Sequence, residues 1–301
     1  MARAERLAAP LVSVIMAMRN SASTIEAAIR SIQMQSLDNW ELILIDDEST
    51  DGSVEVAKTF ADSRIHLQFD GKHLGLAARL NQAVAMSKGE FIARMDADDV
   101  CYPERFAQQV KTLQGDATLD LVGCHALVFT DSGDIVGVMR SGLDHRTITA
   151  HPFDGFPLPH PTWCGRARWF RENPYDAKLM KTQDQDLLLR SFLVSRFAAL
   201  DRVLMGYRQD KPNLAKKIQG RLIFAGSLLR YAVRTGQYIS AVSGILKHFG
   251  KAIVDVGAAA FGLSRFAQRN RFQPVSPNVD QEWSKLWQRL NSKQSVKSCA
   301  E

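Results

Sequence analysis

The first hundred residues alternate regularly between short apolar runs and segments of helical periodicity, and this alternation constrains the fold more than any other feature. Short segments rich in apolar residues predict strands over residues 11–18, 41–45, 64–69 and 90–95. Apolar residues at helical spacing predict helices over residues 21–35, 53–61 and 74–87. Strands that alternate with helices of this length are typical of a parallel α/β sheet, in which ligands bind at the carboxyl ends of the strands.

The remainder of the chain departs from this alternation. A helix is expected over residues 103–113, and residues 119–130 and 134–140 flank a DSGD turn in the manner of a β-hairpin. A loop is expected over residues 151–162, a short helix over 183–192 and a last strand over 203–207. Because the pattern is helical from residue 213 onward, we expect one domain over residues 1–210 and a helical region over residues 211–301.

Charge divides the chain at the same point. Residues 1–210 carry 23 Lys and Arg against 28 Asp and Glu, a net charge of −5, whereas residues 211–301 carry 15 against 4, a net charge of +11. A basic segment of this kind indicates an anionic partner, such as a membrane surface or nucleic acid. A solvated helical tail is the simpler alternative. Nucleic acid is the weaker partner, because no regular set of aromatic residues is interleaved with the basic ones.

Neither the cysteines nor the N-terminus indicates export. The apolar run that follows Arg3 and Arg6 is interrupted by Pro10, so we interpret it as a buried strand and not as a signal peptide. No run of 18 apolar residues occurs, which argues against a transmembrane helix. The cysteines are widely spaced, and we expect reduced thiols in a cytoplasmic protein: Cys101, Cys124, Cys164 and Cys299.

Two acidic clusters follow predicted strands. Asp46, Asp47 and Asp51 follow the second strand, and Asp96, Asp98 and Asp99 follow the fourth. Carboxylates at the carboxyl ends of strands project into the ligand crevice of an open sheet. Closely spaced carboxylates repel one another, and a hard divalent cation such as Mg²⁺ or Mn²⁺ compensates them and usually keeps phosphate ligands. The spacing of neither cluster matches a calcium loop, and the chain has no GxxxxGK[ST] or GxGxxG sequence.

Four segments together resemble the GT-A domain of family 2 glycosyltransferases, especially the bacterial enzymes of capsular, exopolysaccharide and lipopolysaccharide synthesis. They are SVIMAMRNSASTIEAAIRSIQMQS, WELILIDDESTDGS, LGLAARLNQAVAMSKGEFIARMDADD and YPERFAQQV. The resemblance covers about residues 10–210. It implies a Rossmann-like, mostly parallel central sheet flanked by helices, here followed by a basic helical extension. It also implies inverting transfer of a sugar from a nucleoside diphosphate, with uridine as the base.

The resemblance assigns the donor site. Asp47, after the second strand, would hold the base and the ribose, and the segment from Ala17 to Asn20 would line the base pocket. Arg19 stands where the family often has an aromatic residue, and its guanidinium could stack on the base. In the DxD motif, Asp98 would ligate Mn²⁺ or Mg²⁺. Asp96 would contact the ribose or a metal-bound water. Asp99 is then a structural acid that caps the helix at Pro103.

The resemblance also assigns the catalytic base. Inversion needs a carboxylate that takes the proton of the attacking hydroxyl, and the family places it in an "ED" pair at the start of a helix. In TQDQDLLLR this position is Asp184, with Gln183 in place of the usual Glu. The alternative for Asp184 is a structural acid at a helix N-terminus, a part that we give to Asp186.

Further candidates come from the same part of the chain. In PLPHPTWCGR, His160 is expected to contact the diphosphate or the acceptor, or to be structural. Trp163 is expected either to stack on an acceptor sugar or to lie in the core. Arg79 and Arg94 are weaker candidates for phosphate contacts.

The acceptor is expected to be a saccharide or a lipid-linked saccharide. The basic region contains a candidate amphipathic surface that could bind the inner membrane face or pack on the domain: Leu222, Ile223, Leu228, Leu229, Tyr231 and Val233 with Arg221, Arg230 and Arg234. A different class of protein is also compatible with the sequence. Gln183 leaves open a non-catalytic nucleotide-sugar binding subunit docked to a membrane or to a partner enzyme.

Overall fold

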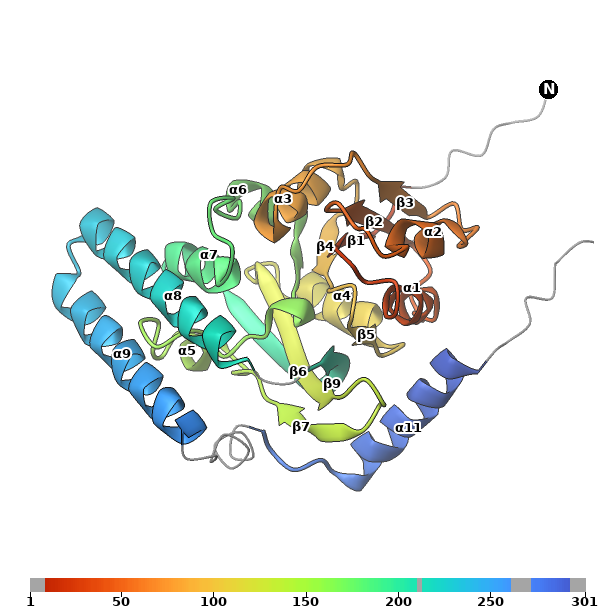
Figure 1. Cartoon of the computed structure of the whole chain (residues 1–301). Helices are drawn as coiled ribbons and strands as arrows, with labels where there is room; N and C mark the ends of the chain where they lie inside the picture. Colours follow the sequence, from red (N-terminus) through yellow and green to blue (C-terminus); the bar gives the residue numbers. More distant parts are fainter. Residues whose placement is uncertain (1–8, 210–212, 261–271, 293–301) are drawn as a thin grey trace, which may run out of the picture.

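The computed structural model describes residues 9–209, 213–260 and 272–292 (Figure 1). Its strands are β1 (Val12–Met18), β2 (Trp40–Asp46), β3 (Ile65–Gln68), β4 (Phe91–Arg94), β5 (Val100–Cys101), β6 (Leu121–Phe129), β7 (Ile135–Met139), β8 (Cys164–Arg166) and β9 (Phe197–Arg208). Its longer helices are α1 (Ile25–Gln33), α3 (Leu76–Met86), α4 (Arg105–Gly115), α7 (Gln183–Ser191), α8 (Leu214–Thr235), α9 (Tyr238–Ala260) and α11 (Pro277–Asn291). The shorter ones are α2 (Ser53–Lys58), α5 (His145–Ile148), α6 (Ala167–Glu172) and the 3₁₀ turn η1 (His160–Thr162).

The strands form one sheet in the order β3-β2-β1-β4-β8-β6-β9-β5, and β7 pairs with β6. The four strands at the β3 end run parallel, as the alternation of strands and helices predicts. In the other half, β8 runs antiparallel to both β4 and β6, whereas β6 and β9 are parallel. Met18 lies beside Asp46 in the register of β1 and β2, so the carboxyl ends of these two strands meet.

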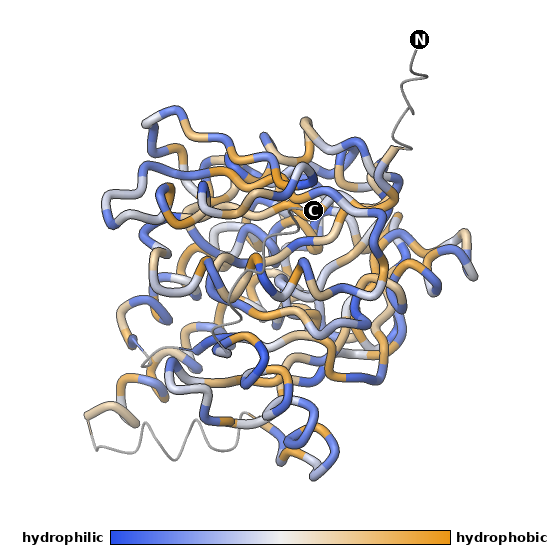
Figure 2. The backbone as a smooth tube through the Cα atoms, turned by 90° about the vertical axis from the view of Figure 1, so that its right-hand side faces the viewer, coloured by the Kyte–Doolittle hydropathy of each residue, from blue (hydrophilic) through white to orange (hydrophobic). Residues whose placement is uncertain are grey.

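Two hydrophobic clusters cover the two faces of this sheet, because alternate residues of a strand point to opposite faces. In β1, Val14 and Met16 belong to one cluster and Ile15 to the other. In Figure 2, short hydrophobic and hydrophilic stretches alternate along the chain. The N-terminal run is thus a buried strand from Val12 onward, as expected.

The C-terminal helices complete both clusters. Trp283 and Leu286 of α11 belong to the cluster that contains α1 and α4, and Leu228 and Tyr231 of α8 belong to the one that contains α3 and α7. Helices α8 and α9 form an antiparallel hairpin beside α7 (Figure 1). The expected boundary at 210/211 lies outside the described residues.

The structure holds free, buried thiols at Cys101, Cys124 and Cys164, and Cys299 lies outside the described residues. Within residues 9–209, 213–260 and 272–292, no helix has the length and apolar character needed to cross a membrane.

Candidate functional site

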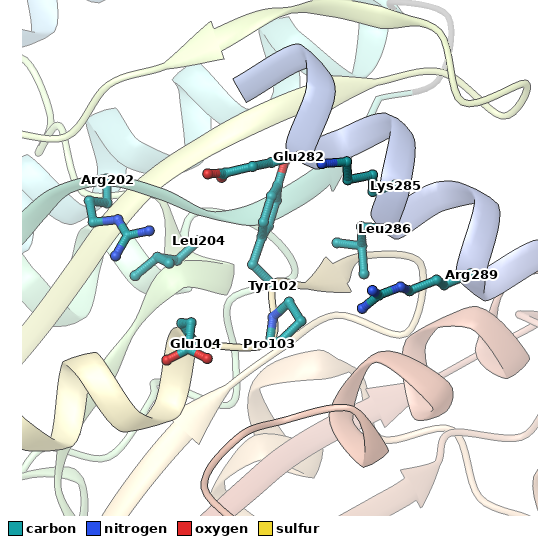
Figure 3. Close-up of a pocket in the computed structure, with 9 residues that line it drawn as sticks. All are labelled: Tyr102, Pro103, Glu104, Arg202, Leu204, Glu282, Lys285, Leu286 and Arg289. Carbon is teal, nitrogen blue, oxygen red and sulfur yellow. The ribbon is translucent and has the colours of Figure 1, made fainter. Parts of the chain in front are cut away.

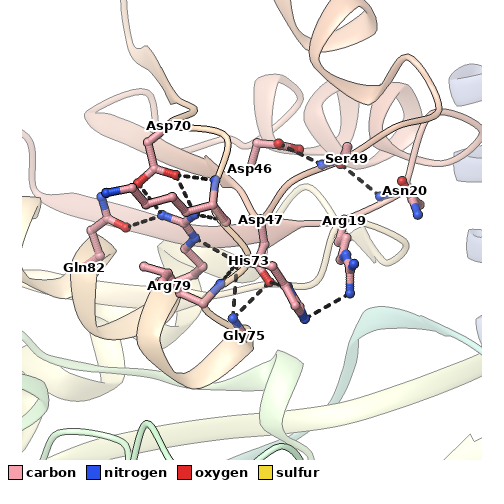
Figure 4. Close-up of polar contacts among 12 residues, drawn as sticks. Arg19, Asn20, Asp46, Asp47, Ser49, Asp70, His73, Gly75, Arg79 and Gln82 are labelled. Atoms are coloured by element: carbon pink, nitrogen blue, oxygen red, sulfur yellow. Dashed lines mark hydrogen bonds and ion pairs between the residues drawn. The ribbon is translucent and has the colours of Figure 1, made fainter.

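Asp47 lies at the meeting point of β1 and β2, where its carboxylate accepts hydrogen bonds from one loop (Figure 4). Its Oδ1 accepts the backbone N–H of Leu74 at 2.7 Å and Nε of Arg79 at 2.9 Å. Its Oδ2 lies 2.7 Å from Nδ1 of His73 and accepts the N–H of Gly75 at 3.0 Å. Burial alone would raise the pKa of Asp47, but these hydrogen bonds lower it overall. The side chain is therefore held as a carboxylate.

Arg19 lies at the open side of this network. Its guanidinium contacts Nε2 of His73 at 3.1 Å, so Arg19, His73 and Asp47 form one chain of polar contacts at the end of β1 (Figure 4). Ala17 is half-buried within β1, beside Ile45 in the register with β2. Arg79 is fully buried between Asp47 and the carboxylate of Asp70, so it is not available for a phosphate.

The second acidic cluster follows β4. Asp96, Asp98 and Asp99 each offer a carboxylate oxygen within 4.8 Å of the others. Desolvation in this recess, and then the charge of Asp96, raise the pKa of Asp98 to about 6, although its side chain reaches solvent. Carboxylate oxygens that repel one another in this way suit a hard divalent cation, which neutralises the repulsion and takes oxygen ligands. The residues present therefore fit a Mn²⁺ or Mg²⁺ site.

Asp99 does not cap the helix at Pro103, contrary to expectation. Helix α4 begins at Arg105, and Asp99 is buried and accepts the backbone N–H of Arg208 at 2.9 Å. Nε of Arg208 donates to the carbonyl of Asp98 at 2.8 Å. The expectation was wrong because β9, which is distant in sequence, lies nearer to Asp99 than the following helix does.

A cavity of about 540 Å³ joins the acidic cluster to the predicted base. Its wall includes Arg94 and Asp96 from the end of β4 and Asp184 from the first turn of α7. Arg94 is buried and forms an ion pair with Asp96. Desolvation at the cavity wall raises the pKa of Asp184. A carboxylate of this kind is a better proton acceptor than an exposed aspartate.

Gln183 and Thr182 shape the approach to Asp184. Gln183 is buried in the cavity wall, and its Oε1 has no hydrogen-bond partner among the described residues. Thr182 has a φ of 57°, a left-handed conformation that is strained for a β-branched residue. Within the described chain, the other non-glycine residues with positive φ are Asn20 and Glu48, which follow β1 and β2. Backbone strain thus occurs at three loops around the candidate site.

His160 and Trp163 have mainly structural environments. His160 is buried, lines the cavity, and places Nε2 2.8 Å from the hydroxyl of Tyr175. Burial and the charge of Arg94 lower the pKa of His160 well below its usual value, so the ring is neutral. Trp163 is fully buried and donates Nε1 to the carbonyl of Leu158 at 3.0 Å. Stacking of Trp163 on an acceptor is therefore ruled out, and its alternative place in the core is correct.

Asp186 has the structural role that was expected of it. It is buried one turn into α7 and forms ion pairs with Arg190 at 2.8 Å and Arg230 of α8 at 3.3 Å. Sequence reasoning missed His73 and Arg208 altogether. The only local signal for either is its position beside a predicted strand end, because the partners of each lie 26 or more residues away.

A separate cavity of about 280 Å³ lies where α11 packs on the domain (Figure 3). Leu204 and Tyr102 lie on the side of the domain, and charged side chains surround them from both sides: Glu104, Arg202, Glu282, Lys285 and Arg289. None of the residues of the two acidic clusters lines this cavity, so it is a gap left by helix docking and not part of the site.

Comparison with known sequences identifies the family. The model of Glycosyl transferase family 2 matches residues 13–176. Putative glycosyltransferase EpsE of Bacillus subtilis is 32% identical over 257 residues, which are 81% of this chain and 91% of that protein. UDP-Glc:alpha-D-GlcNAc-diphosphoundecaprenol beta-1,3-glucosyltransferase WfgD of Escherichia coli is 34% identical over 127 residues, which are 42% of this chain and 49% of that protein.

Comparison with solved structures identifies the fold. Mannosyltransferase PcManGT from Pyrobaculum calidifontis, in complex with GDP-Man and Mn²⁺, superposes with a TM-score of 0.58 at 19% identity, over 94% of this chain and 86% of that one. This likeness and the sheet order confirm the expected GT-A architecture. The family model and the likeness to EpsE confirm the resemblance seen in the sequence, and the chain belongs to glycosyl transferase family 2.

Proposed function

We propose that this glycosyltransferase is an inverting, metal-dependent enzyme that transfers a sugar from a UDP-sugar to a hydroxyl of a saccharide or lipid-linked saccharide. The observation that carries the proposal is the single cavity that Asp96 and Asp184 share. A donor diphosphate beside the acidic cluster and an acceptor beside Asp184 would then face each other across one space. The lipid-linked acceptor in the name of WfgD, a sugar on diphosphoundecaprenol, supports a lipid-linked saccharide as the acceptor and a role in cell-surface polysaccharide synthesis.

The nucleoside would bind at the carboxyl ends of β1 and β2. Both carboxylate oxygens of Asp47 already have hydrogen-bond partners in the loop around His73, so neither is free to bind a nucleoside. A base N–H that donates to Oδ2 of Asp47 would therefore displace His73, whose ring is 40% exposed and can move. Arg19, from the segment after Ala17, would stack on the base. The choice of uridine is supported by WfgD, whose donor is UDP-Glc, whereas the PcManGT complex contains GDP-Man.

The chemical step needs one proton transfer. Asp184 takes the proton of the acceptor hydroxyl while that oxygen forms a bond to the anomeric carbon from the face opposite the diphosphate. The bond between this carbon and the diphosphate oxygen breaks, and the diphosphate leaves with the electron pair. Asp98 and Asp96 would hold Mn²⁺ or Mg²⁺, which when bound supplies Lewis-acid stabilisation of the leaving diphosphate. His160 and Gln183 line the acceptor side of the cavity.

A panel of UDP- and GDP-sugars with Mn²⁺ tests the proposal through release of the nucleoside diphosphate. We expect a UDP-sugar to be turned over, and Asp98→Ala to lose the part of UDP affinity that depends on Mn²⁺. UDP affinity in Asp98→Ala equal to that of the wild type would refute the ligand role of Asp98. Binding of a nucleotide sugar without hydrolysis or transfer, with every acceptor tried, would favour the non-catalytic binding subunit.

A further inference from the structure

The α8–α9 hairpin exposes a large set of apolar side chains. In α9 six of the exposed apolar residues recur at intervals of three and four: Ile239, Val242, Leu246, Phe249, Ile253 and Val256. Tyr238 and Val254 are exposed as well. In α8 they are Leu222, Leu229 and Val233. Ile239 is 89% exposed, Ile253 73% and Leu246 66%. Exposed apolar side chains that gather in this way, and do not occur singly, mark an interaction site.

The exposed residues of the two helices lie on one side of the hairpin. A shallow apolar groove between the helices is lined by Leu222 and Ala225 of α8 and by Phe249 and Ala252 of α9. The opposite side of the hairpin faces the domain: Arg230 pairs with Asp186, and Gly244 lies against Phe153. We call the side that carries the six spaced residues of α9 and the three of α8 the outer face. It consists of residues from both helices, and at its edge Ile239 also lines a cavity with residues 150–154 of the domain.

The charges of the hairpin lie beside the outer face, and Arg221 and His248 also line the groove between the two helices. The charged residues of α9 are spaced four apart along another side, at Lys247, Lys251 and Asp255. Across both helices, seven Lys and Arg stand against the single acid Asp255, a net charge of +6. Four of the basic residues form ion pairs: Lys217 and Arg221 with Asp255, Arg230 with Asp186 and Lys247 with Asp154. Lys216, Arg234 and Lys251 are in none of these ion pairs.

We propose that the outer face docks on the surface of an anionic phospholipid bilayer. An apolar face flanked by Lys and Arg is the arrangement of helices that lie in the plane of a membrane interface. Long basic side chains can place their apolar stems along the face and extend their charges to lipid phosphates. A second copy of the chain fits less well, since face-to-face packing would bring together two hairpins that each carry a net charge of +6.

Docking would hold the catalytic domain at the membrane surface, with the hairpin between the domain and the lipid. Helix α7, which begins with Gln183 and Asp184, is joined to α8 through the Asp186–Arg230 ion pair and through Nζ of Lys181, which donates to the carbonyl of Lys216. An acceptor sugar on a lipid carrier would reach Asp184 from the side on which its lipid is held. This last step rests on the proposed function, whereas the docking surface itself does not.

Sedimentation with vesicles of phosphatidylglycerol and phosphatidylcholine, without any substrate, tests the surface. We expect the wild-type protein to bind these vesicles, and to bind vesicles of phosphatidylcholine alone more weakly. The double variant Leu246→Glu/Ile253→Glu should lower the bound fraction at least about tenfold, since it replaces two exposed apolar side chains of the face with carboxylates, which an anionic surface repels. Val194→Glu is the matched control, because Val194 is 86% exposed between α7 and β9, outside the hairpin.

Several results would overturn the proposal. The wild type could fail to bind the anionic vesicles, or Val194→Glu could lose as much binding as the double variant. The double variant could also change from a dimer to a monomer with unaltered vesicle binding, which would assign the face to a second copy. Unaltered thermal unfolding and UDP binding of the double variant would show that it is folded. Loss of sugar transfer with retained vesicle binding would count against the proposed function and not against the surface.

Discussion

Asp184 lies half-buried at the cavity wall. Its ionised carboxylate lowers the stability of the folded protein there, but it can accept the proton of the acceptor hydroxyl. We expect Asp184→Asn to lower the rate of transfer by about 10²–10⁴-fold, the usual contribution of a positioned base. UDP affinity should be unchanged, because Asp184 is expected to contact the acceptor and not the nucleotide. Turnover assays measure the rate of transfer, and titration calorimetry measures the affinity for UDP. Turnover at the wild-type rate in Asp184→Asn would exclude the residue as the base.

The raised pKa of Asp184 has opposite consequences for activity and for stability. The ionised carboxylate is the base, so kcat/KM should rise with pH through a pKa above the ordinary value of about 3.9 for aspartate. Because the pKa of Asp184 is raised in the folded state, the protonated carboxyl group favours folding. This contribution to stability is fully present below the unfolded-state pKa and is lost as pH rises through the folded-state pKa. Asp184→Asn should therefore be as stable as the wild type at pH 7, or more so. A lower unfolding free energy in urea would contradict this.

Arg208 links the acidic cluster to the C-terminal helix α11. Its guanidinium lies over Phe129 at 4.7 Å and Trp287 of α11 at 5.7 Å, while its Nε holds the carbonyl of Asp98. Arg208→Lys keeps the charge but cannot reproduce the planar, stacked contact. We expect the Mn²⁺ affinity measured through UDP binding to fall by about 10–100-fold, the usual effect of losing a group that orients a metal ligand. UDP binding without metal should not change.

Asp131 provides the matched control for Arg208. It accepts from Nη1 of Arg208 at 3.0 Å but is 75% exposed, so Asp131→Ala removes a surface ion pair and leaves the stacked contacts in place. Such pairs contribute little. Equal losses of Mn²⁺ affinity in Asp131→Ala and Arg208→Lys would show that charge alone, and not the stacked geometry, supports the metal loop.

At the scale of elements, the sequence predicts the helices and strands that have a clear local pattern of apolar residues. The strands from β1 to β4 and the helices between them carry periodicity over many residues, and they occur close to where it places them. Strand β8 has only three residues, Cys164–Arg166, and forms because β4 and β6 lie on either side of it. No local pattern reveals such a strand. Likewise, Asp184 could be found because it stands in a recognisable segment, whereas the role of Arg94 depends on tertiary contacts.

Docking of α11 depends on space left by glycine. An added Cβ at Gly206 of β9 would meet the ring of Trp283 at 2.7 Å, and Trp283 is buried and donates to the carbonyl of Gly133. We expect Gly206→Ala to lower the free energy of unfolding by about 1–3 kcal/mol, the cost of overpacking. Chemical denaturation measures the change. In the control Gly226→Ala, the added methyl lies in α8 without a close contact, so this variant should gain about 0.5–1 kcal/mol.

At the scale of the whole molecule, the charge pattern separates the C-terminal region from the rest of the chain, whereas the hydrophobic packing joins the two. The basic region from residue 211 onward is distinct in composition, and we expected a separate helical region there. Its helices nevertheless supply members of both hydrophobic clusters, such as Leu228 and Trp283. A domain has its own hydrophobic core. We therefore propose one folding unit whose last part also carries the outer face.

A truncation tests this single unit. A fragment of residues 1–209 would expose the apolar side chains that α8 and α11 cover, so we expect it to unfold at a markedly lower temperature than the full chain or to aggregate. The full chain should unfold in one cooperative transition. UDP and Mn²⁺ together should raise its unfolding temperature, because a ligand at 100 Kd adds about 2.7 kcal/mol to the free energy of unfolding. Calorimetry measures both. A fragment that retains the unfolding temperature and UDP affinity of the full chain would show instead that the C-terminal helices are an appendage, and that the sheet alone completes the site.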